Sequence, residues 1–149
     1  MSKPRAIPYK ATLLVRDACL CLHVQRAARA LARRFDDALR PAGLTNGQFS
    51  LMMSLNRPDP PSVGSVAALL AMDRTTLTAA LKPLERRGLV KVSIDADDRR
   101  SRLLALTDAG HVTLGNALPV WKREHARSEA AVTRGGPDRL RRDLNDLNR

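Results

Sequence analysis

The stretch from Ser93 to Arg102, SIDADDRRSR, places three aspartates beside three arginines. Arginine carries a planar fork of hydrogen-bond donors that matches phosphate, so this cluster is suited to contact with a polyanion. The aspartates oppose that attraction unless they have a second task. One such task is to hold a guanidinium in place before binding, because a free arginine side chain loses up to about 2 kcal/mol of rotamer entropy when it is fixed.

Asp98 is the aspartate placed to hold an arginine, since it stands two residues before Arg100 and therefore on the same side of an extended strand. The alternative is that Asp95, Asp97 and Asp98 form the tight turn of a hairpin tip. We prefer that alternative for Asp95 and Asp97. For Asp98 both interpretations stay open.

The composition favours an anionic partner. The 149 residues contain 26 Lys and Arg against 15 Asp and Glu, which gives a formal net charge of +11. Nucleic acid, a membrane surface and an acidic protein are all compatible with that charge. The longest apolar run, 66–72, is too short to span a bilayer and the first ten residues lack the apolar core of a secretory signal, so we expect a cytoplasmic protein. Two cysteines agree with a reducing compartment.

Apolar periodicity predicts a mainly helical chain. One long helix is expected from about Arg16 to Leu39, and a second begins at the capping box formed by Thr45 and Gln48. A short third helix covers 66–70. A fourth begins near Arg74, with Asp73 or Thr75 as its cap. Later helices are predicted after Thr107 and Asp108 and around Leu140, Leu144 and Leu147, and kinks are expected at Pro83 and Pro119.

One short exception interrupts the helices. The segments LVKVSI and RLLAL flank the aspartate and arginine cluster and predict a β-hairpin. The fold class is therefore mainly α with a small β-hairpin. The fourth helix buries Leu77, Leu81 and Leu84, and its opposite face is small, polar and basic. A short helix braced against such a helix is the helix-turn-helix arrangement, and the hairpin is the wing. A solvated amphipathic face is the alternative.

These segments together resemble the MarR family of winged helix-turn-helix regulators. The resemblance runs from about Ala18 to Gly110 and is strongest in RPAGLTNGQFSLM, LLAMDRTTLTAALKPLERRGLV and DADDRRSRLLALTDAG. It implies a homodimer, with dimerisation helices at 10–40 and 111–149 and a winged helix-turn-helix region at 45–110 within a single chain of 1–149. It also implies that the dimer binds a palindromic operator in double-stranded DNA, usually to repress transcription.

The resemblance also implies roles in the wing and on the fourth helix. Asp98, Arg99 and Arg100 match an Asp-x-Arg element seven residues before Thr107, in which the second arginine enters the minor groove and the aspartate holds it. Many relatives follow TLT with Arg-Asn, whereas this chain has Ala79 and Ala80. The predicted DNA contacts are Arg74, Thr75, Thr76, Thr78, Lys82, Arg86, Asp98, Arg99, Arg100 and Arg102, with Thr75, Thr78 and Lys82 as the main readers.

Family members often respond to small aromatic effectors or to oxidants, so the resemblance implies a second site. Its candidates are Cys19, Cys21, His23, Met52 and Trp121. Packing is the competing interpretation for all five, and Cys19 with His23 supplies only two ligands, too few for a zinc site. The sequence therefore predicts no metal and no cofactor.

The sequence favours a DNA-binding regulator over two other classes. Catalysis needs a nucleophile with its base, paired carboxylates or a phosphate-binding glycine loop, and none stands at a recognisable spacing. We therefore expect a transcriptional regulator, a repressor relieved by a small-molecule or redox signal, and not an enzyme. The alternative is a non-specific architectural nucleic-acid-binding protein.

Overall fold

The computed structural model of the chain describes residues 5–149, and residues 1–4 of the expected single chain lie outside the described part. The chain divides into two compact units, residues 1–34 and 35–149. The first unit contains α1 (Tyr9–Ala18) and most of α2 (Leu20–Leu39), which ends in the second unit.

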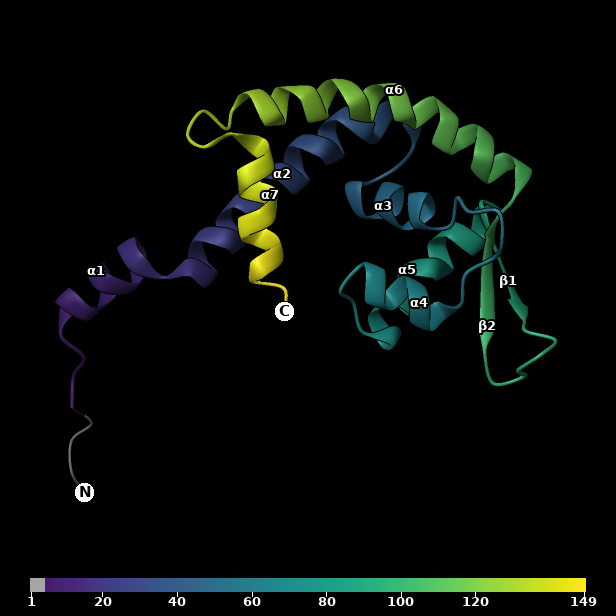
Figure 1. The fold of residues 1–149 in the computed structure, drawn as a ribbon, viewed down its shortest axis with the longest axis horizontal. Helices are drawn as coiled ribbons and strands as arrows, with labels where there is room; N and C mark the ends of the chain where they lie inside the picture. The colour runs from purple at the N-terminus through teal and green to yellow at the C-terminus, as the bar shows by residue number, and fades with distance from the viewer. Residues whose placement is uncertain (1–4) are drawn as a thin grey trace. The chain divides into compact units, whose positions relative to one another are not determined.

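The second unit confirms the predicted fold class of helices with one small hairpin (Figure 1). A single 3-10 turn, Arg40–Ala42, follows α2. The remaining elements are α3 (Asn46–Ser54), α4 (Val63–Leu69), α5 (Arg74–Arg86), β1 (Val90–Ile94), β2 (Arg102–Leu106), α6 (Asp108–Ala130) and α7 (Gly136–Asp146).

The single long helix predicted from Arg16 to Leu39 is wrong, because the chain leaves the helical conformation at Cys19. Cys19 has an extended backbone, with φ −71° and ψ 109°, and its N–H donates to the carbonyl of Val15. The Sγ atom of Cys19 accepts the N–H of Leu22 at 3.4 Å, as a serine hydroxyl does at an N-cap. Cys19 therefore ends α1 and caps α2.

The predicted starts of α3, α5 and α6 are confirmed. The helix predicted over 66–70 begins earlier, at Val63, because Ser62 caps it. At α3 the Thr45 side chain accepts the N–H of Gln48 at 3.1 Å, and the Gln48 side chain accepts the N–H of Thr45 at 3.0 Å. At α5 the Asp73 carboxylate accepts the N–H of Thr76 at 2.7 Å. Because these bonds favour the ionised form, they lower the pKa of Asp73. The cap is therefore charged at neutral pH and is lost only in acid, as the pH falls through the lowered pKa.

One hydrophobic core holds the second unit together. Six of its side chains are fully buried: Leu39, Met52, Val66, Leu77, Leu84 and Leu104. They come from five elements, α2, α3, α4, α5 and β2, so the core links the helix-turn-helix to the hairpin. The predicted buried face of α5 is confirmed, since Leu77, Leu81 and Leu84 are at most 3% exposed.

Both prolines predicted to disturb helices lie inside continuous helices. Pro83 is within α5 and Pro119 is within α6, and neither helix ends there. Figure 1 shows α6 as an arched helix, which agrees with the loss of one backbone hydrogen bond at Pro119. None of the described helices is long and apolar enough to cross a membrane.

The C-terminal helix α7 is tied to α6 by Arg141. Its guanidinium donates to Glu129 of α6 at 2.6 Å and to Asp138 at the start of α7 at 2.5 Å. The hydrogen bond from Arg141 lowers the pKa of Glu129, so this link persists at neutral pH.

A junction around Thr107 joins the hairpin to the helices on either side of it. The Thr107 hydroxyl donates to the carbonyl of Gly88 at 2.6 Å and accepts the N–H of Gly110 at 3.0 Å. The Thr107 N–H donates to the carbonyl of Leu89 at 3.1 Å. Gly110 is buried, and a Cβ there would overlap that same carbonyl oxygen. The junction therefore has room for glycine alone.

We predict that Gly110→Ala destabilises the protein by about 1–3 kcal/mol or more, because the obstructing atom belongs to the backbone and cannot turn aside. Gly115→Ala is the matched control in the same helix. Nothing lies within 4 Å of a Cβ at Gly115, so that variant should be neutral or up to about 1 kcal/mol more stable. Urea unfolding of both variants provides the measurement, and equal midpoints would contradict the tight junction.

Candidate nucleic-acid interface

The helices α4 and α5 form a compact helix-turn-helix. Ser62 caps α4 by accepting the N–H of Ser65 at 3.1 Å. The turn that follows contains Ala71, whose φ of 51° is left-handed and therefore strained for a residue with a side chain. The N–H of Met72 donates to the carbonyl of Ala67 at 2.9 Å and closes the turn. The turn leads directly to Asp73, the cap of α5.

The outward face of α5 is polar and basic, as predicted. The exposed residues on this helix include all six of its predicted DNA contacts: Arg74, Thr75, Thr76, Thr78, Lys82 and Arg86. At 100° per residue, Thr75, Lys82 and Arg86 point directly away from the buried leucines. Arg74 and Thr78 lie one turn apart on the flank of that face.

The three threonines differ in how free their hydroxyl groups are. The Thr76 hydroxyl donates to the Asp73 carboxylate at 2.8 Å, so it belongs to the cap. The Thr78 hydroxyl donates to the carbonyl of Arg74 at 2.8 Å, which leaves its oxygen able to accept. Thr75 is exposed, and no protein group of the described chain hydrogen-bonds its hydroxyl. Thr75 is therefore the threonine best able to read a base edge.

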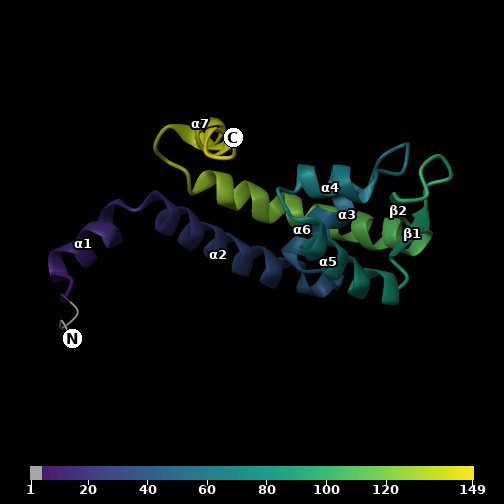
Figure 2. The same cartoon turned by 90° about the horizontal axis from the view of Figure 1, so that it is seen from below.

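The hairpin is anchored at its base and extends away from the helices. Its strands pair antiparallel, with Val90 opposite Leu106 and Ile94 opposite Arg102. The N–H of Leu104 donates to the carbonyl of Pro61 at 2.9 Å, which fixes β2 to the segment that enters α4. Figure 2 shows the tip between β1 and β2 projecting beyond the helices of this unit. This is the geometry of a wing.

The aspartates of the wing bond to its backbone and not to its arginine side chains. Asp95 accepts the N–H of Asp97 at 2.9 Å, and Asp98 accepts the N–H of Arg100 at 3.1 Å. The carbonyl of Asp98 also accepts the N–H of Ser101 at 2.8 Å. The described wing has no ion pair between Asp98 and the guanidinium of Arg100, so the structure does not show the predicted side-chain hold. The turn-forming interpretation is confirmed for Asp95 and extends to Asp98.

A groove separates the wing from the start of α5. We call it the wing groove; its lining is Ser62, Val63, Gly64, Arg74, Thr78, Asp98, Arg100, Ser101 and Arg102, and its volume is about 360 Å³. Three arginines thus face one space against a single carboxylate. The Arg102 guanidinium donates to the carbonyls of Arg99 and Ser101 at 3.1 and 3.3 Å, so its position is fixed by backbone.

The structure therefore divides the predicted DNA contacts into two groups. Arg74, Thr78, Asp98, Arg100 and Arg102 meet in the wing groove. Thr75, Lys82 and Arg86 are on the outer face of α5, Thr76 serves the cap, and Arg99 is exposed at the wing tip. Sequence reasoning missed Ser62 and Gly64, because residues before and inside α4 carry no charge or motif that marks them.

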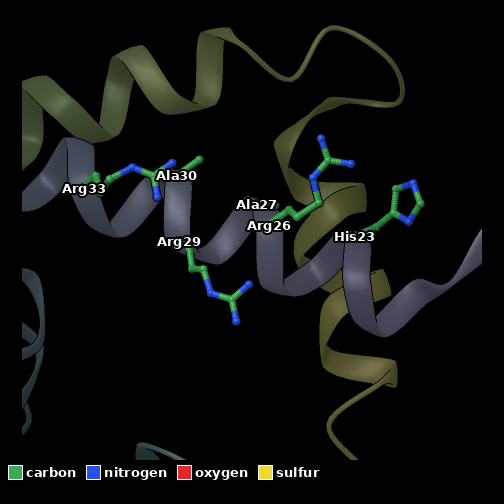
Figure 3. Close-up of a pocket in the computed structure, with 6 residues that line it drawn as sticks. All are labelled: His23, Arg26, Ala27, Arg29, Ala30 and Arg33. Atoms are coloured by element: carbon green, nitrogen blue, oxygen red, sulfur yellow. The ribbon is translucent and has the colours of Figure 1, made fainter. Parts of the chain in front are cut away.

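The predicted effector and redox residues come from both units, and Cys19, Cys21 and His23 belong to the first. His23 lines an open pocket on α2 with Arg26, Ala27, Arg29, Ala30 and Arg33, with a volume of about 520 Å³ (Figure 3). Its Nδ1 atom lies 2.7 Å from the carbonyl oxygen of Cys19. Cys19 is half-buried, whereas Cys21 is exposed and its Sγ accepts from Gln25 at 3.1 Å. No group of three or more metal-ligating side chains occurs among the described residues.

Met52 and Trp121 belong to the second unit. Met52 is 0% exposed in the core, which agrees with the packing interpretation. Trp121 is half-buried and stacks between Phe49, at a ring distance of 5.9 Å, and His125, at 4.5 Å. An effector role for either residue stays a prediction.

Comparisons with known proteins agree with this geometry. The MarR family model matches residues 44–101, which contain α3, α4, α5, β1 and the tip of the wing. The transcriptional activatory protein BadR of Rhodopseudomonas palustris is 35% identical over 94 residues, which are 61% of this chain and 54% of BadR. The chain thus spans about half the length of that curated relative.

Two solved structures of DNA complexes are similar over most of the chain. The M. tuberculosis transcriptional regulator MosR, in complex with DNA, is 40% identical, with 87% of this chain and 92% of MosR covered and a TM-score of 0.79. The transcriptional repressor CouR, bound to a 23-mer DNA duplex, is 29% identical, with 91% and 96% covered and a TM-score of 0.79. The matching fold, the family model over the helix-turn-helix and the first part of the wing, and the identity to MosR together place this chain in the MarR family.

Proposed function

We propose that the protein is a sequence-specific double-stranded DNA-binding transcriptional regulator that acts as a repressor. The observation that carries the proposal is the wing groove, where arginines from α5 and from the wing face one space next to the exposed face of α5. That arrangement suits a major groove read by α5 and a minor groove entered by the wing. The relatives MosR and CouR, whose complexes with DNA are known, support it.

We propose that the protein binds DNA and is not an enzyme. We also propose that it acts in the cytoplasm, where a bacterial regulator has access to DNA. The groove offers guanidinium and hydroxyl groups, which bind phosphate oxygens and base edges. We assign Thr75 and Thr78 to base reading, and Lys82 and Arg86 to phosphate contact. A small aromatic or oxidising signal that relieves repression stays a prediction for five residues: Cys19, Cys21, His23, Met52 and Trp121.

The function is tested by titrating the protein with duplexes from upstream of its own coding sequence and with shuffled duplexes of the same composition. At a fixed salt concentration the proposal expects at least one upstream duplex to bind about 10³-fold more tightly than its shuffled form, with an inverted repeat in the footprint. Equal affinity for every duplex would instead favour the architectural alternative.

We further propose that the protein is a homodimer that uses α1, α2, α6 and α7. The observation is the set of large apolar side chains that the single chain leaves exposed: Leu14, Val15, Leu20, Val24, Leu31, Leu140, Leu144 and Leu147. They lie in α1, α2 and α7, with Leu147 directly after α7, and include the periodic positions expected of a helical seam. Two copies would present two α5 helices about 34 Å apart to successive major grooves.

Light scattering should therefore give the mass of two 16.4 kDa chains at micromolar concentration. The double variant Leu144→Lys with Leu147→Lys should shift the mass toward a single chain, because it places charges in the proposed seam. Ile94→Lys is the control, since Ile94 is a similarly exposed apolar residue on the wing. A native protein that is folded as a single chain would exclude the dimer.

Asp98 permits a test that separates its charge from its hydrogen bond. Asp98→Asn removes the negative charge from the wing groove but keeps an oxygen that can accept the N–H of Arg100. We expect this variant to bind DNA about two- to threefold more tightly at low salt. Asp98→Ala removes the charge and the turn bond together, so it should bind less tightly than Asp98→Asn.

Asp95→Asn and Asp95→Ala are the matched controls. Asp95 likewise accepts the N–H of the residue two positions later, Asp97, in the same wing tip. Asp95→Asn should again bind DNA more tightly than Asp95→Ala. Both changes in affinity should be smaller than those at Asp98, since Asp95 does not line the groove. Weaker binding by Asp98→Asn, measured in the same buffer, would instead restore the guanidinium-holding role.

A further inference from the structure

Gly64 in α4 lies against the guanidinium of Arg74, the first residue of α5. A Cβ built on Gly64 would lie 2.9 Å from Nη2, 3.5 Å from Cζ and 3.7 Å from Nε of Arg74. All three atoms belong to the guanidinium, so this group occupies the space that any side chain at residue 64 would need. Both residues line the wing groove.

The position of Arg74 on α5 separates it from the residues that face outward. Arg74 and Thr78 are one helical turn apart and share the flank that borders the groove, whereas Thr75 and Lys82 are on the outer face. In the described chain no carboxylate pairs with Arg74, so its charge is available to an anion. Arg100 and Arg102 face it across the same groove.

We propose that Gly64 is a positioning residue, whose missing side chain lets Arg74 lie against α4 and contact a DNA phosphate at the wing groove. The inference rests on the proposed DNA-binding function. It adds a residue of α4, outside both α5 and the wing, to those that determine DNA affinity. We assign Arg74 to phosphate and not to a base, because its guanidinium is drawn back over α4 and away from the outer face of α5.

A methyl group added at residue 64 should affect thermal stability and DNA affinity in opposite directions. Alanine forms helix more readily than glycine, and the atoms in its way are the far end of a flexible side chain, so the fold accepts the change. The guanidinium of Arg74 must move, however, and the phosphate contact moves with it. Gly64→Ala should therefore keep or raise thermal stability while it weakens DNA binding, which a structural role for Gly64 would not produce.

The experiment compares the native protein with Gly64→Ala, Arg74→Ala and the double variant, using the upstream duplex and its shuffled form between about 50 and 200 mM salt. Gly47→Ala is the matched control, because Gly47 is likewise the second residue of a capped helix and nothing lies within 4 Å of its Cβ. Melting followed by circular dichroism monitors the fold of every variant.

Gly64→Ala is expected to weaken binding to both duplexes on the order of tenfold and to reduce the salt slope by about one unit per protomer. The double variant should bind like Arg74→Ala alone, since the glycine acts through that arginine. Gly47→Ala should bind like the native protein, and the melting midpoint of Gly64→Ala should be unchanged or higher.

Native affinity and salt slope in Gly64→Ala would overturn the inference. So would an additional loss from Gly64→Ala in the Arg74→Ala background, because the glycine would then act without the arginine. A loss of binding that comes with an equally lowered melting midpoint would assign Gly64 a structural role instead. If the native protein binds neither duplex, the proposed function itself fails, and that result is distinct from the others.

Discussion

The position of the wing depends on the hydrogen bonds of Thr107. Its hydroxyl connects the end of α5, through the carbonyl of Gly88, to the first turn of α6, through the N–H of Gly110. Its N–H bonds the carbonyl of Leu89, next to the glycine that leaves room for it. Because the hairpin begins and ends at this junction, three elements share one fixed point, and the arginines at the wing tip act from a rigid base.

The features that the sequence predicts are those with a local cause. A capping box spans four residues, the buried face of α5 repeats every three or four, and a hairpin needs two short apolar runs around a turn. The break before α2 has no such signal, because apolar periodicity continues across it and cysteine is not a common cap. The contact of Gly64 with Arg74 joins two helices, so its cause lies in packing and not in spacing.

The acids beside the wing arginines show where spacing alone is ambiguous. An aspartate two residues before an arginine can reach either its guanidinium or its backbone N–H, and the sequence is the same in both cases. The structure selects the backbone. A bond to the backbone orders the tip itself, whereas the side chain of Arg100 is not held by Asp98, so part of the entropy cost of ordering it remains for the moment of binding.

An acidic residue also lies next to basic ones at the N-terminus of α5. A helix N-terminus attracts anions because its first N–H groups are unpaired, but here the ionised Asp73 already bonds the N–H of Thr76. Its negative charge offsets the positive end of the helix dipole at the point where α5 would approach DNA. In the proposed complex, side chains would therefore bind a phosphate at this point, and the arginines of the wing groove are placed to do so. The acid thus stabilises the helix and, through the same negative charge, weakens the attraction of the helix start for an anion.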